Sequence, residues 1–170
     1  MRSGIDDGTA ALCEHVRNHR AHRAHVAVEL RLQHGVHLDE FQTTSSRAHC
    51  QRTFDLPSDR TLFLYIGRIH SIKGLDLLLD AISHIPKNMW YLVIAGSDEG
   101  ELRSLQMQAR QSGIDGQVRF LGPIAGKEKA MLFHAVDAFV YPSRSEGFSV
   151  GILEAAAAGL PLLLTKGCHF

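Results

Sequence analysis

The chain has 170 residues, of which 45% are hydrophobic and 21% charged, and its formal net charge is zero with the histidines neutral. This composition is ordinary for a globular domain, and the balanced charge gives no reason to expect a nucleic-acid partner. No apolar run approaches the roughly 20 residues that cross a bilayer, and no signal peptide is visible. The three cysteines are scattered without metal-ligand spacing, which predicts free thiols, no bound metal and a cytoplasmic location.

Residues 1–25 are poorly defined and are expected to lie outside the domain predicted at 26–170. His15, His19 and His22 would share one face of a short helix, which could bind a metal but fits a solvated basic face better. From Val26 apolar residues alternate with others, which predicts a strand. The polar stretch at 42–59 is expected to be a loop or linker.

A regular alternation of strand and helix patterns begins at Thr61, the start of the predicted core at 61–170. Short apolar runs predict buried strands, and apolar residues at helical spacing predict the helices between them. The predicted strands are 62–67, 90–96, 117–122, 138–143 and 160–165, and the predicted helices are 74–85, 97–113, 126–137 and about 148–158.

This alternation predicts an α/β fold, a Rossmann-like parallel β-sheet with flanking helices. Continuous apolar strands fit a sheet that is covered on both faces. In such sheets ligands bind beyond the C-terminal ends of the strands. The loops expected there carry glycine and charge, and function is therefore expected in the segments 68–74, 96–100, 122–129 and 143–148.

The stretch from Ser145 to Pro161 carries two glutamates eight residues apart, Glu146 just before a predicted helix and Glu154 nearly two turns inside it. The N-terminus of a helix presents unpaired N–H groups and the positive end of the helix dipole, which favour a phosphate. The two carboxylates could accept hydrogen bonds from sugar hydroxyls. Two glutamates on one helix are often simply solvated, so the neighbouring loops decide between these interpretations.

Arg68 and Lys73 lie in one predicted loop at the same edge of the sheet. A guanidinium forks onto phosphate oxygens and an ammonium acts as a mobile point charge, so together with the helix N-terminus they would form a pyrophosphate pocket. Two solvated cations on an exposed loop are the alternative. The sequence lacks the glycine-rich loops of dinucleotide dehydrogenases and P-loop NTPases and the G-x-S-x-G turn of acyl hydrolases, so it gives those classes no support.

Together these segments resemble the nucleotide-binding C-terminal domain of the family 4 glycosyltransferases, which have the two-domain GT-B fold. The matching stretches occur in the family's order and include its E-x7-E signature at Glu146 and Glu154. They cover about 30–170, most closely 61–165, and read GRIHSIKGLDLLLDAI, LVIAGSDEG, VRFLGPIAGKEKAMLF and AVDAFVYPSRSEGFSVGILEAAAAGLPLLLT.

The resemblance implies an enzyme that transfers a sugar from a nucleotide-diphosphate sugar to a sugar or lipid acceptor. Transfer would retain the configuration at the anomeric carbon and would need no cofactor. Arg68 and Lys73 would neutralise the donor diphosphate, where charge grows in the transition state. Glu146 would contact the donor sugar, and Glu154 would hold the ribose hydroxyls.

The resemblance also implies contacts around these charged residues. Backbone amides of Gly147, Phe148 and Ser149 would meet phosphate or sugar. Ile124 and Lys129 would lie near the base of the nucleotide.

The chain departs from the family in its length. Nothing before Leu30 could form the N-terminal domain that binds the acceptor, and the GT-B half is expected to be incomplete at its C-terminus. We therefore expect a fragment with little or no transferase activity by itself. Any peripheral membrane contact of the parent would run through the missing N-terminal domain. A non-catalytic nucleotide-sugar-binding module and an inactive fragment are the alternatives.

Overall fold

The computed structural model describes residues 45–168. The strand predicted from Val26 and the face formed by His15, His19 and His22 lie outside the described residues. The strands are β1 (Thr61–Ile66), β2 (Trp90–Ala95), β3 (Val118–Gly122), β4 (Ala138–Tyr141) and β5 (Leu162–Leu164), the α-helices are α2 (Arg47–Thr53), α3 (Leu75–Ser83), α4 (Leu102–Gln111), α5 (Gly126–Ala135) and α6 (Val150–Ala157), and the 3-10 turns are η3 (Ser71–Lys73), η4 (Asp115–Gln117) and η5 (Lys166–Cys168).

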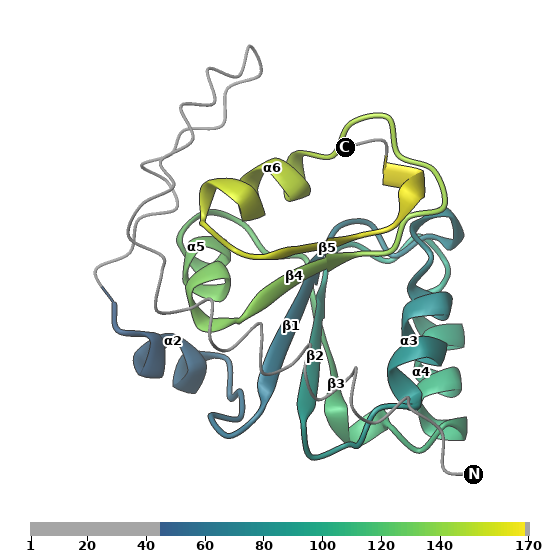
Figure 1. The fold of residues 1–170 in the computed structure, drawn as a ribbon, viewed down its shortest axis with the longest axis horizontal. Coiled ribbons are helices and arrows are strands. Elements are labelled where there is room, and N and C mark those ends of the chain that lie inside the picture. Colours follow the sequence, from purple (N-terminus) through teal and green to yellow (C-terminus); the bar gives the residue numbers. More distant parts are fainter. Residues whose placement is uncertain (1–44, 169–170) are drawn as a thin grey trace, which may run out of the picture.

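All five strands form one parallel sheet in the order β3-β2-β1-β4-β5, as the alternation of patterns predicts. The chain runs from β1 to one edge at β3 and then returns to the other side of β1. Right-handed crossovers in opposite directions place their helices on opposite faces. Accordingly α3 and α4 cover one face and α5 the other, with α2 beside it, while α6 packs on β4 and β5 (Figure 1).

The strand order reverses between β1 and β4. In doubly wound sheets this reversal opens a crevice at the C-terminal ends of the two central strands, and ligands bind there. The loops that follow β1 and β4 are those that carry Arg68, Lys73 and Glu146. The fold therefore brings together residues that lie more than 70 positions apart in the sequence.

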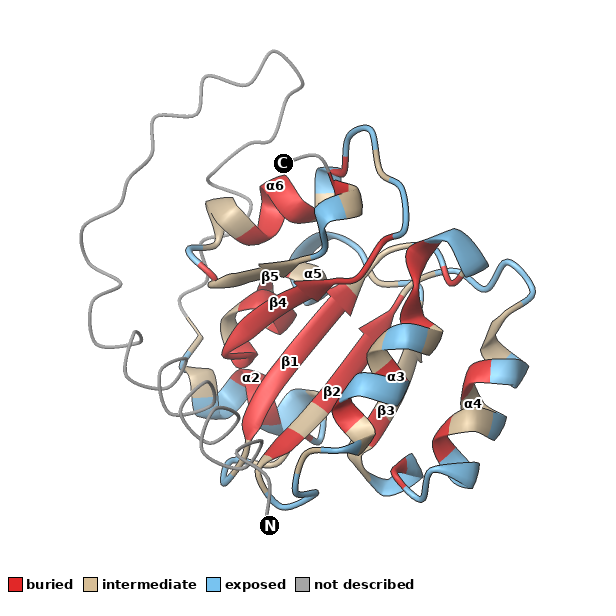
Figure 2. Ribbon diagram, turned by 45° about the vertical axis from the view of Figure 1, so that its right-hand side comes forward, coloured by how far each residue is buried: buried red, intermediate tan, exposed pale blue. Residues whose placement is uncertain are grey.

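The three central strands are buried on both faces, which explains their continuous apolar sequences. Figure 2 shows them as a buried layer, whereas β5 at the edge is only partly buried. Trp90 is fully buried and its indole N–H donates to the carbonyl oxygen of Ile85 at 3.2 Å, so it is a core residue as expected. No helix in the described part of the chain is long and apolar enough to span a membrane.

The stretch predicted as a loop at 42–59 contains helix α2, and that prediction was wrong. Ser46 caps the helix by accepting the N–H of His49 at 3.2 Å, and Cys50 is fully buried against the core. Arg47 donates to the carbonyl oxygen of Val136 at 2.7 Å. A short polar helix is stable here because of these tertiary contacts, which local sequence patterns do not reveal.

The helix predicted from about Phe148 begins at Val150. Ser149 adopts an extended backbone and its hydroxyl accepts the N–H of Ile152 at 3.4 Å, so it is the N-cap. Glu154 consequently lies in the second turn of α6, closer to the helix N-terminus than expected.

The helix predicted from Ser97 is shorter at both ends and begins at Leu102. The Asp98 carboxylate lies before the helix and accepts the N–H groups of Gly100, Glu101 and Leu102 at 2.8–3.0 Å. These hydrogen bonds, the one from Leu102 foremost, lower the pKa of Asp98. Asp98 thus satisfies backbone N–H groups at the start of α4 although it lies before the helix, in line with its prediction as a cap residue.

Candidate functional site at the switch point

The loops after β1 and β4 are held against each other by backbone hydrogen bonds. The N–H of Arg144 donates to the carbonyl oxygen of Ile72 at 2.8 Å, and the Ser143 hydroxyl donates to the same oxygen at 3.2 Å. Gly74 lies at the close approach with φ of +66°, and a side-chain carbon there would lie 2.2 Å from the carbonyl oxygen of Pro142. Glycine is therefore required at this position for the two loops to meet.

Arg144 adds a side-chain clamp between the same loops. Its guanidinium donates to the carbonyl oxygen of Ser71 at 2.6 Å and to both carboxylate oxygens of Asp76 at 2.8 and 2.5 Å. The hydrogen bond from Arg144 lowers the pKa of Asp76 and outweighs the opposing effect of burial. The geometry of the site is thus fixed in part by a residue that the sequence did not single out.

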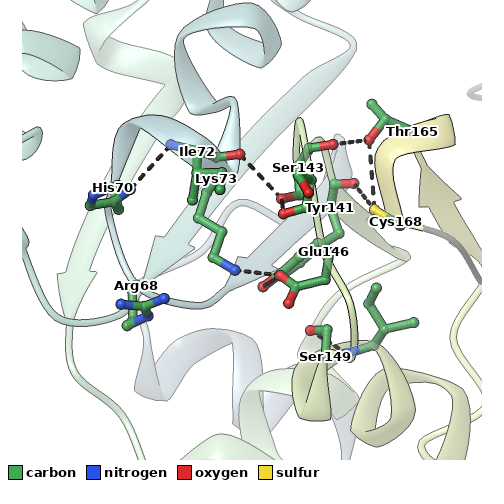
Figure 3. A network of polar contacts seen from close by, with 12 residues as sticks. Arg68, His70, Ile72, Lys73, Tyr141, Ser143, Glu146, Ser149, Thr165 and Cys168 are labelled. Carbon is green, nitrogen blue, oxygen red and sulfur yellow. Dashed lines mark hydrogen bonds and ion pairs between the residues drawn. The ribbon is translucent and has the colours of Figure 1, made fainter.

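Lys73 and Glu146 form an ion pair at the centre of the site (Figure 3). Their side chains are only 8% and 12% exposed. Burial by itself lowers the pKa of Lys73, but the interactions with Glu146 and Tyr141 outweigh burial, and the net pKa is raised. Lys73 is therefore a fixed cation at neutral pH.

Two stacked tyrosines, Tyr141 and Tyr65, lie beside this ion pair. The hydroxyl of Tyr141 donates to Glu146 Oε2 at 3.1 Å, and Lys73 Nζ lies 5.5 Å from the centre of the Tyr141 ring. Tyr65 stacks on Tyr141 with ring centroids 5.2 Å apart, and its hydroxyl donates to the carbonyl oxygen of Arg68 at 2.8 Å. Burial raises the pKa of Tyr65, so its hydroxyl remains a protonated donor in this environment.

Sequence reasoning missed both tyrosines because they lie in apolar strand patterns typical of the core. One signal was present: Tyr141 ends its strand and Tyr65 is the last residue but one of its strand, and a loop with predicted site residues follows each strand. Only the strand order shows that these two strand ends are neighbours.

Arg68 lies on the loop after β1 but contacts a different carboxylate. Its side chain is 59% exposed, and its Nη1 is 3.1 and 2.8 Å from the two carboxylate oxygens of Glu99. Glu99 follows β2, and its N–H donates to the carbonyl oxygen of Ile69 at 3.0 Å, which links the two loops. The structure thus places Arg68 at the predicted edge of the sheet and pairs it with Glu99 rather than Glu146.

The second signature glutamate also has a cationic partner. Glu154 on α6 is buried, and its Oε1 lies 2.5 Å from Nζ of Lys129 on α5. The structure thus brings together two residues that were singled out in separate segments. Ile124 precedes α5 and packs partly buried against the core.

The segment between the two glutamates is exposed up to the helix cap. Gly147 and Phe148 are exposed, the Phe148 side chain at 52%, whereas Ser149 is buried and uses its hydroxyl as the cap of α6. The hydroxyl of Ser149 is therefore engaged by the helix cap. Within residues 45–168, no group of three or more potential ligand residues could hold a metal ion.

An apolar pocket of about 490 Å³ lies between α3 and the β4–β5 edge of the sheet. Its lining contains no charged residue, so it does not offer the groups that a phosphate needs. The lining consists of Leu77, Leu78, Ala81, Val140, Pro142, Leu162, Leu163, Leu164 and Thr165.

Comparison with known proteins agrees with this architecture. Residues 48–170 match the family described as glycosyl transferases group 1. D-inositol 3-phosphate glycosyltransferase of Streptomyces avermitilis is 35% identical over 160 residues, which are 88% of this chain and 34% of that protein. The chain thus spans about a third of the length of the curated relatives that it matches.

Solved structures of glycosyltransferases resemble the fold. The C-terminal domain of LpcC, a glycosyl transferase group 1 family protein from Francisella tularensis, is 27% identical with a TM-score of 0.67, over 79% of this chain and 72% of that domain. Anabaena Alr3699/HepE, solved in complex with UDP-glucose, is 24% identical with a TM-score of 0.71, over 79% of this chain and 38% of that one. These likenesses identify the sheet as one half of a GT-B glycosyltransferase.

Proposed function

Because the chain belongs to the group 1 glycosyltransferases, we propose that its switch-point site binds the nucleotide-diphosphate sugar donor of a glycosyl transfer reaction. The observation that carries the proposal is the buried pair of Lys73 and Glu146 between the loops after β1 and β4. A buried ion pair is costly to desolvate and is weak evidence for a stabilising role. A pair placed where α/β sheets bind ligands is better explained by a ligand that uses both charges.

The donor diphosphate would lie beside Lys73, ahead of α6. An ammonium has three donors, so Lys73 can contact a phosphate oxygen while it still contacts Glu146. Its raised pKa keeps it charged while negative charge grows on the departing diphosphate. Arg68 would exchange Glu99 for a phosphate oxygen, which is feasible because its side chain is exposed.

The carboxylates would bind the sugars at each end of the diphosphate. Glu146 would accept a hydrogen bond from a hydroxyl of the donor sugar. Glu154, which is paired with Lys129, would accept hydrogen bonds from the ribose hydroxyls. Gly147 and Phe148 are exposed residues ahead of α6, and their backbone amides would meet phosphate or sugar. Lys73 and Arg68 would provide the positive charge at the diphosphate, so the proposed transfer needs no metal. That transfer retains the anomeric configuration is proposed from the family resemblance alone.

Transfer itself requires an acceptor site. The chain spans 34% of the relative from Streptomyces avermitilis, and we assign acceptor binding and turnover to parts of a longer protein. This chain alone would bind donor and transfer little sugar. Substantial turnover by the purified 170-residue chain would refute that assignment, and the sugar or lipid acceptor stays a prediction.

The buried thiols of Cys50 and Cys168, which form no disulfide, fit the cytoplasmic location proposed from the sequence.

Calorimetric titration of the chain with UDP-glucose, GDP-glucose and ADP-glucose tests the proposal. UDP-glucose is the first probe because HepE was solved with it. We expect saturable binding of at least one donor, weakened about 10- to 100-fold by Glu154→Ala, because hydrogen bonds to a charged group are lost. Glu128→Ala is the matched control, since Glu128 is an exposed glutamate on α5. Absence of binding by all three donors would refute the proposal.

A further inference from the structure

We propose that Tyr141 is a positioning residue of the donor site, whose hydroxyl holds the Glu146 carboxylate in place for the donor sugar. The inference rests on the proposed function, because it assigns a task to Glu146 that only a bound donor reveals. Tyr141 itself contacts Glu146 and Lys73 and would not need to touch the donor.

The Tyr141 ring is a rigid support. It is the last residue of β4, is only 3% exposed, and lies between two other rings. Tyr65 stacks on it at 5.2 Å with an interplanar angle of 21°, and Phe139 at 5.9 Å with 18°. A ring held in this way has no freedom to move its hydroxyl, so the hydrogen bond to Glu146 has a fixed origin.

Glu146, by contrast, stands on an exposed loop. Its neighbours Ser145 and Gly147 are both exposed. Its Oε2 accepts hydrogen bonds from both the Lys73 ammonium and the Tyr141 hydroxyl, while its Oε1 has no hydrogen bond within residues 45–168. One oxygen is therefore anchored and the other is left for a ligand.

The two anchors of Glu146 differ when a donor binds. Lys73 would then share the three donors of its ammonium between the diphosphate and Glu146, which weakens its hold on Glu146. The Tyr141 hydroxyl is carried by a buried, stacked ring that cannot move towards the diphosphate, so it keeps its hydrogen bond. Tyr141 is therefore the anchor that maintains the position of Glu146 while the donor sugar is bound.

The test compares Tyr141→Phe with Tyr91→Phe, which makes the same chemical change at a half-buried tyrosine. Tyr91 is the second residue of β2, at the end of the strand away from the site. Each variant and the wild type are titrated with UDP and UDP-glucose, GDP and GDP-glucose, and ADP and ADP-glucose. The pair that binds the wild type most tightly is analysed. The phenylalanine ring preserves the stacking and the contact with Lys73, so unfolding midpoints are measured only to establish that the variants fold.

We expect Tyr141→Phe to weaken binding of the nucleotide sugar about tenfold and to leave binding of the nucleotide alone within about twofold, because only the sugar uses Glu146. Tyr91→Phe should change neither. A merely structural role would weaken both ligands equally, and that result, or an unchanged ratio, overturns the inference while the donor site stands. If the wild type binds neither ligand of any pair, the proposed function and the inference fall together.

Discussion

Replacing Lys73 by methionine should destabilise the chain because it leaves a buried carboxylate without its cation. Removing one partner of a buried ion pair typically costs 3–5 kcal/mol. Here Glu146 is 12% exposed and keeps the hydrogen bond from Tyr141, so we expect the lower end, about 3 kcal/mol. For a domain of this size that loss lowers Tm by roughly 6–12 °C.

The pairing is isolated by adding Glu146→Gln. The double variant Lys73→Met/Glu146→Gln has no unpaired charge, so it should be more stable than Lys73→Met alone. Urea unfolding followed by the fluorescence of the buried Trp90 measures the free energies of unfolding of the wild type, of each single variant and of the double variant. Additive losses, or a loss below about 0.5 kcal/mol for Lys73→Met, would refute the account of a buried pair.

The same pair makes a prediction about pH. The pKa of Lys73 is raised above its usual 10.5, so the folded state holds this proton more tightly than the unfolded state. The stability due to the shift is fully present below the unfolded pKa and disappears as the pH rises through the folded pKa. The difference in stability between wild type and Lys73→Met should therefore stay constant from pH 7 to about 10 and shrink only above that.

Two further changes test the loops around the pair. Glu99→Gln should free Arg68 for the diphosphate and tighten nucleotide binding about two- to fivefold, the range of an exposed ion pair, and the gain should shrink in high salt; the control Glu101→Gln in the same loop should have no such effect. Weaker binding by Glu99→Gln would contradict the exchange of partners. Gly74→Ala should cost at least about 3 kcal/mol of stability, whereas Gly116→Ala, where a side chain meets open space, should stay within about 0.5 kcal/mol; equal unfolding midpoints for the two would refute the close approach.

The elements of the core could be predicted because their patterns are local. Apolar runs such as Leu62–Gly67 and helical spacing after Gly74 depend on a few neighbouring residues, and the structure confirms the five core strands and four helices between them. The sequence did not predict helix α2 because the stability of this helix comes from tertiary contacts such as that of Arg47 with Val136. Its sequence alone resembles a polar linker.

The sequence predicted that the candidate site residues lie at one edge of the sheet, but it could not predict which of them form ion pairs. The sequence indicated Lys73, Glu146 and Glu154 as separate features of loops and a helix. Which cation meets which carboxylate depends on the strand order, and this is why Lys129 could not be assigned to Glu154 from the sequence. Tyr141 escaped for a different reason, since its apolar ring fits a buried strand equally well without any functional role.

A crystal structure of the chain with the bound nucleotide of its preferred donor would locate the donor site. The diphosphate should lie within hydrogen-bond distance of Lys73 Nζ, ahead of the N-terminus of α6, with the ribose hydroxyls on the carboxylate of Glu154. A nucleotide seated elsewhere, for example in the apolar pocket beside Leu163, with Lys73 and Glu154 untouched, would contradict the proposed site.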